Sequence, residues 1–325
     1  MNYRKIIGEA WYFTQENKKL IVWFAFIPSF LSTVVGVFYI LYQFYAFKSS
    51  PLFEDWQQSF TFVVVKEVFN LVMEHMDNLV PLFIVAGILV LLYFFLPPLM
   101  DGAMIQLIAR KKNKQDVRIR DGLRYGFMSF LPLFSFYLIT RTYNFFSIAS
   151  DASFLIRNLG PNVFNLLLPL LILITVLSII LTLIFMFTEY YIVIDDCRVT
   201  KAMAKSAVLT VQHWDTTIFI SFLMLIISIR IILQVVFVLL VPGIIFMVIF
   251  YFAASTIPFF GLIIGAVMAV AALFLASYLG AIVHVFMTSV WAFTFLDLTN
   301  EPEIDARGKF IEEKEEITAH IKSSE

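Results

Sequence analysis

Three ionisable side chains stand inside long apolar stretches of the sequence. Arg230 lies near the middle of one stretch, Asp101 follows a pair of prolines in another, and His284 lies in the last. An arginine at the centre of a bilayer costs at least ~2.5–3.5 kcal/mol by insertion scales. We therefore expect an intramembrane polar cluster, in which Asp101 is the acidic partner of Arg230 and His284 is a second polar group.

The sequence is compatible with three interpretations of this cluster. In the first, it lines a transport pathway or a pocket for an anionic substrate, because intramembrane charges commonly serve function. In the second, an Arg230–Asp101 pair ties two helices together and orders the bundle. In the third, the register of the spans is shifted, and Arg230 lies at the membrane interface.

The residues give little support for catalysis, nucleotide binding or metal binding. The sequence has no nucleotide-binding glycine motif, no H-E-x-x-H and no cluster of cysteines. Its four histidines are far apart, and the single Cys197 cannot form an internal disulfide. Glu189 is expected to be a loop or helix-cap residue at the inner interface. We therefore predict no catalytic residue, no cofactor and no metal ion.

The composition is that of a membrane protein. Of the 325 residues, 61% are hydrophobic and 14% are charged, and the mean hydropathy is +0.88. Soluble domains carry about 25% charged residues, so a soluble globular enzyme is excluded, as are disordered and coiled-coil chains. The net charge of −1 provides no broad basic surface for nucleic acid. We predict an all-α integral membrane protein.

Six apolar runs are long enough to cross a bilayer, which takes roughly 20 residues. A shorter run at 243–258 is interpreted as a re-entrant or interfacial piece, and a seventh crossing there is the alternative. The segment 48–78 is expected outside, as an interfacial helix or a lid, and an acidic tail, 300–325, follows the single membrane domain 1–299. The predicted spans are 20–45, 79–99, 126–148, 163–187, 217–241 and 261–295.

Lysine and arginine are distributed unevenly between the two sides of this arrangement. Eighteen lie on the side that carries both termini and four on the other, and positive charge favours the cytoplasm. Both termini are therefore predicted to be cytoplasmic, in a multi-pass protein of the plasma (inner) membrane. A seventh crossing would reduce the bias to fourteen against eight. The basic segment 110–124 is expected to enforce this topology and to touch anionic headgroups.

Amphipathic stretches precede the odd-numbered spans. They begin near residues 3, 119 and 199, and their apolar residues recur at the three- and four-residue spacing of one helix face. We interpret them as interfacial helices on the cytoplasmic side, each followed by a helical hairpin. The three units are either internal repeats, which are common in transporters, or hairpins that look alike because all are hydrophobic.

The stretch after the fourth span is the most distinctive. It reads Tyr191-Ile-Val-Ile-Asp-Asp-Cys-Arg-Val-Thr-Lys-Ala-Met-Ala-Lys-Ser-Ala, and Trp214 follows. This pattern resembles a group of prokaryotic membrane proteins that includes the membrane domain attached to some glycerophosphodiester phosphodiesterases. Shorter matches stand at 10–13, 98–103 and 291–297.

This resemblance implies a six-helix module whose own activity is not established. In the enzymes that contain it, the hydrolase activity belongs to a separate soluble barrel domain, for which the 26-residue tail has no room. No catalytic residue of those enzymes maps onto this sequence. The chain departs from the pattern at Arg230 and in the long outer segment after the first span.

Together these observations favour a non-enzymatic membrane protein, acting as a scaffold or accessory protein through protein or lipid contacts. The alternative is a small transporter or lipid-handling permease that uses Arg230, Asp101 and His284. The lipid bilayer is the first expected partner, and another membrane protein or a further copy of the chain is the second. Nucleic acid is not expected to bind.

Overall fold

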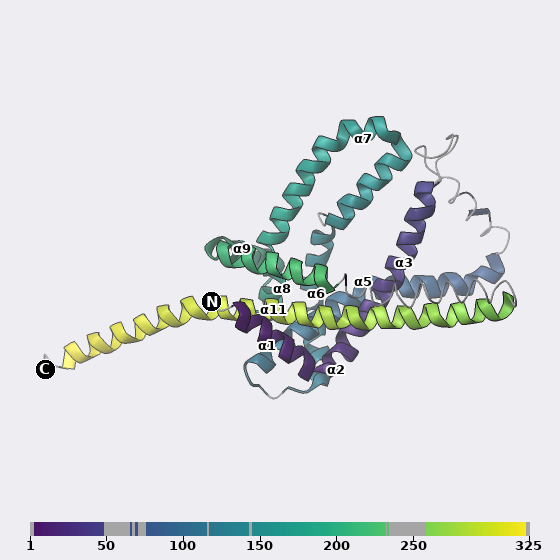
Figure 1. Cartoon of the computed structure of the whole chain (residues 1–325). Coiled ribbons are helices and arrows are strands. Elements are labelled where there is room, and N and C mark those ends of the chain that lie inside the picture. The colour runs from purple at the N-terminus through teal and green to yellow at the C-terminus, as the bar shows by residue number, and fades with distance from the viewer. Residues whose placement is uncertain are drawn as a thin grey trace.

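The computed structural model is built of helices (Figure 1). It describes residues 3–48, 66, 69–70, 76–115, 117–142, 145–231, 233 and 258–322, and these ranges contain no strand. Six helices within them are long and apolar enough to cross a membrane. The predicted all-α polytopic membrane fold is thereby confirmed. The pieces predicted at 48–78 and 243–258 fall mostly outside the described residues.

The chain begins with α1 (Tyr3–Glu16), which is joined through Asn17 to the first span. That span consists of α2 (Lys18–Leu20), a π-helical turn η1 (Ile21–Ala25) and the start of α3 (Phe26–Lys48). The helices that follow are α5 (Met76–Lys112), α6 (Ile119–Thr142), α7 (Phe145–Ile184), α8 (Thr188–Val193), α9 (Val199–Gln212), the helix Trp214–Ile231 and α11 (Pro258–Lys322).

The candidate spans of the structure overlap the six predicted ones but differ from them at their ends. Where a helix extends beyond the predicted span, as at 100–112 and 119–125, its hydrogen bonds continue through polar residues that hydropathy does not mark. The fifth span ends at Ile231, at the limit of the described stretch. The candidate spans are Lys18–Ile40, Phe83–Lys112, Ile119–Arg141, Ser147–Val193, Trp214–Ile231 and Ala266–Thr299.

Two of the three amphipathic stretches form separate helices, α1 and α9. The stretch that begins near residue 119 does not, because α6 runs without interruption from Ile119 to Thr142. Its small residues Gly122 and Gly126 pack against α5 rather than facing the membrane surface. The expected interfacial helix is therefore the first part of the third span, and the prediction of a separate helix there is wrong.

The α5–α6 hairpin depends on very close approach of the two helices. A Cβ atom added to Gly126 would lie 2.4 Å from the carbonyl oxygen of Leu99, and one added to Gly122 would lie 2.5 Å from Leu107 Cδ1. The two glycines are four residues apart on one face of α6, the spacing that lets membrane helices pack backbone against backbone. This packing positions Asp101 on α5.

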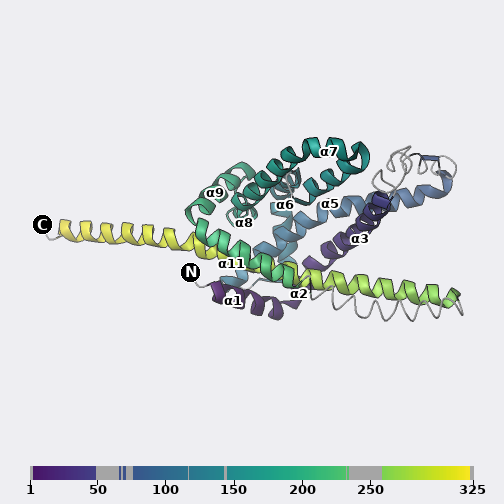
Figure 2. The same cartoon turned by 45° about the horizontal axis from the view of Figure 1, so that its top comes forward.

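A bend divides α7 into two arms. Gly160 has a φ of +80°, which glycine adopts without steric cost, and Pro161 follows it. The two arms form an arch that stands out in both views (Figures 1 and 2).

A second break separates α7 from α8, and α9 satisfies the backbone groups that it frees. The Ser206 hydroxyl donates to the carbonyl of Ile184 at 2.8 Å and accepts from the amide of Phe187 at 3.1 Å. Thr210 donates to the same Ile184 carbonyl at 3.3 Å. Because such groups have no water to bond in lipid, these contacts fix the direction in which α8 leaves α7.

The hydrophobic core lies where α1, α5, α8 and α11 meet, and it includes fully buried side chains from each. By contrast, the segments of α3, α5, α7 and α11 farther from this core expose many large apolar side chains, as expected of surfaces in contact with lipid. The last part of α11 projects beyond α1 in both views (Figures 1 and 2).

We predict that Gly126→Ala destabilises the protein by about 1–3 kcal/mol, because the new methyl group forces α5 and α6 apart. The measurement is the free energy or midpoint of unfolding in lipid–detergent micelles. Gly87→Ala on α5 is the matched control, since nothing lies within 4 Å of its added Cβ. Equal stability of the two variants would contradict close α5–α6 packing.

Candidate functional site

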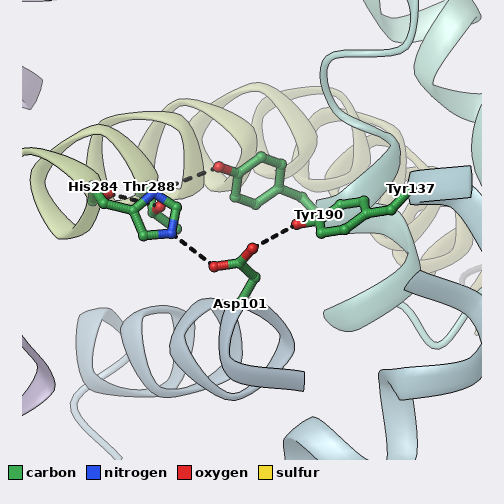
Figure 3. Close-up of polar contacts among 5 residues, drawn as sticks. All are labelled: Asp101, Tyr137, Tyr190, His284 and Thr288. Carbon is green, nitrogen blue, oxygen red and sulfur yellow. Dashed lines mark hydrogen bonds and ion pairs between the residues drawn. The ribbon is translucent and has the colours of Figure 1, made fainter. Parts of the chain in front are cut away.

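A hydrogen-bonded polar cluster joins three candidate spans. Asp101 on α5 is only 8% exposed. One of its carboxylate oxygens accepts a hydrogen bond from the Tyr137 hydroxyl of α6 at 2.8 Å, and the other lies 2.7 Å from Nε2 of His284 on α11. Figure 3 shows both partners pointing at the carboxylate. The structure therefore brings together Asp101 and His284, two of the three residues that the sequence indicates.

The contact between Asp101 and His284 is suited to holding a proton. With a protonated ring it is an ion pair without net charge, and with a neutral ring it is a hydrogen bond donated by Nε2–H to an anionic carboxylate. The His284 side chain remains 43% exposed, whereas that of Asp101 is 12% exposed. His284 is thus the more exposed member of the pair.

A second carboxyl group stands near this pair. Glu189, in the first turn of α8, is half-buried and close enough to interact electrostatically with Asp101 and His284. The neighbouring Tyr190 donates its hydroxyl to the carbonyl of Thr288 on α11 at 3.5 Å, which links α8 to the same part of α11 (Figure 3). Glu189 therefore lies near the cluster, in the first turn of α8, and its expected role as a loop or helix-cap residue stays a prediction.

Arg230 is not the partner of Asp101, and this prediction is wrong. Both Asp101 oxygens are engaged by Tyr137 and His284. Arg230 itself is exposed, and within the described ranges no hydrogen bond or ion pair involves it.

The orientation of its helix explains why Arg230 points elsewhere. Ile220 and Met224 are buried, and one turn further on Ser228 contacts Met287 of α11 with its hydroxyl 3.6 Å from the sulfur. These residues define the face that packs against the rest of the protein. At about 100° per residue, Arg230 lies roughly 200° around the helix from Ser228 and faces away.

Sequence reasoning missed Tyr137 and Glu189. In the sequence, Tyr137 is one of many aromatic residues. Its hydroxyl lies within reach of α5, and only the packing of the helices shows this. Glu189 follows an apolar run after one threonine and looks like the polar end of that run. The signal available in the sequence was that five apolar or aromatic residues, Tyr190–Ile194, follow it before the polar loop begins.

Other chemistry has no comparable arrangement in the part of the chain that is described. No group of three or more His, Cys, Asp or Glu side chains there has the geometry to hold a metal ion. Comparison with protein-family models, with curated proteins and with solved structures gives no match for this chain. The resemblance to a phosphodiesterase membrane domain stays a prediction.

We predict that Tyr137→Phe destabilises the protein by about 1.5–3 kcal/mol, because a buried carboxylate loses a hydrogen-bond donor. Thermal or denaturant unfolding in micelles measures the effect. Tyr278→Phe on α11 removes a hydroxyl from an exposed tyrosine and serves as the control. If both variants unfolded like the unmodified protein, the Tyr137–Asp101 bond would not be stabilising.

Proposed function

We propose that this integral membrane protein is a non-enzymatic transporter that moves protons across the membrane through the Asp101–His284 pair. The observation that carries the proposal is a nearly buried carboxylate bonded to a histidine and a tyrosine from two other spans. Ionisable groups are costly at this depth, and chains of Asp, Glu and His there commonly relay protons in pumps and transporters.

The order of the groups supports a route for the proton. The half-exposed His284 contacts Asp101, and Glu189 lies close to both. Glu189 stands near Val193, where the fourth span ends, and a non-helical turn follows. In the orientation that we propose from the Lys and Arg distribution, with both termini in the cytoplasm of a plasma membrane, this turn faces the cytoplasm.

A scaffold or accessory role is the second candidate, and one observation favours it. The contacts of Asp101 join α5, α6 and α11 next to a well-packed core, as an interhelical tie would. In that role the exposed apolar helix surfaces would bind lipid, another membrane protein or a second copy of the chain. The two candidates differ in whether protons cross the membrane.

Proton movement into vesicles separates the two candidates. The protein is reconstituted into liposomes that contain a pH-sensitive dye, and valinomycin with a potassium gradient imposes an inside-negative potential. We expect the interior to acidify faster than in protein-free vesicles, and Asp101→Asn to remove this excess because the proton-binding carboxylate is gone.

Arg230→Gln is the control, since Arg230 lies outside the cluster, and its vesicles are expected to behave like those of the unmodified protein. Folding of each variant is checked by its elution as a single species. Acidification by the unmodified protein at the protein-free rate would reject proton translocation and favour the scaffold.

A further inference from the structure

The last turn of α5 lies beside the start of the first span, and a side-chain hydrogen bond joins them. Lys111 donates from Nζ to the side-chain oxygen of Asn17 at 2.5 Å, across 94 residues of sequence. Asn17 is held in turn by its own amide nitrogen, which donates to the carbonyl of Phe13 at 2.9 Å. This contact places the Lys111 ammonium beside the two residues that follow Asn17, which are Lys18 and Lys19.

Positive charge accumulates here, and no described carboxylate forms an ion pair with these three lysines. Lys19 is close enough to Lys111 for the two ammonium groups to repel each other. Of the two acidic residues of α1, Glu9 pairs with Lys112, and Glu16 forms no ion pair among the described residues. None of the ion pairs among described residues includes Lys18, Lys19 or Lys111.

Two further features strengthen the positive field. Lys111 is half-buried, so water screens its charge less than that of a fully exposed lysine. The 23-residue helix Lys18–Ile40 begins at this point, and the positive end of its dipole favours anions over the two lysines that stand there. Folding thus holds like charges together, an arrangement that a bound anion would stabilise.

The position relative to the membrane indicates the kind of anion. Lys18 begins one candidate span and Lys112 ends another, so the lysines lie at the level of lipid headgroups. The adjacent α1 exposes Trp11 and Tyr12, residue types enriched at that level. A phosphate attached to a lipid reaches this place without crossing the apolar layer.

We propose that Lys19 and Lys111, positioned by Asn17, bind the phosphate of an anionic phospholipid headgroup. The two ammonium groups supply hydrogen-bond donors for the phosphate oxygens, and the Asn17 bond holds that of Lys111 in place. A zwitterionic lipid is disfavoured, because its choline group would bring another positive charge to Lys18 and Lys19. This site is independent of the Asp101–His284 cluster and of the transport proposal.

The test is retention of lipid by the full-length protein, after reconstitution into vesicles of equal phosphatidylglycerol and phosphatidylcholine and gentle extraction for native mass spectrometry. We expect phosphatidylglycerol to be retained by the unmodified protein and lost from Lys19→Gln/Lys111→Gln. Arg4→Gln/Lys201→Gln removes two exposed charges from the same predicted side and is expected to retain the lipid. Equal retention by both double variants would overturn the proposal.

A second variant distinguishes loss of the lipid site from misfolding of the protein. Lys19→Glu places a carboxylate beside Lys111, which should raise the melting temperature without lipid and abolish the further rise that phosphatidylglycerol gives the unmodified protein. A continued rise of the same size in Lys19→Glu would contradict the site. Inorganic phosphate alone is expected to give no such rise, and an equal rise with phosphate would show a site for the free anion instead of a lipid.

Discussion

A buried polar group in a membrane must find its partner within the protein, and the described structure follows from this constraint. Asp101 could not occupy α5 at 8% exposure without the donors on α6 and α11, because an unpaired carboxylate in a low-dielectric interior costs several kcal/mol. The same constraint operates on the backbone. The α7–α8 break persists because Ser206 and Thr210 on α9 satisfy the groups that it frees.

Because of these contacts, the geometry of the site depends on how the helices pack. Tyr137 reaches Asp101 from α6, which Gly122 and Gly126 allow to pack closely against α5. Glu189 and Tyr190 face the cluster because α9 determines how α8 leaves α7. The groups of the cluster are consequently held by helices on several sides, and His284 is more exposed than Asp101.

Features that depend on composition can be predicted from the sequence. Features that depend on how a helix is rotated about its axis cannot. Six apolar runs indicate the spans, and Asp101 and His284 stand out because each interrupts one. Arg230 interrupts one too, but the face on which it lies depends on packing through Ser228 and Met287, which hydropathy does not encode. Tyr137 and Glu189 gain their roles only from residues distant in sequence, so no local pattern identifies them.

The central claim is that the Asp101–His284 pair binds a proton at membrane depth. Nitrogen-15 NMR of histidine-labelled protein in bilayers tests it most directly, with the His284 signals assigned through His284→Gln and followed from about pH 5 to about pH 9. We predict that the His284 ring signals change with pH and that Asp101→Asn shifts this titration. A single neutral tautomer of His284 at every pH, unaffected by Asp101→Asn, would contradict the account.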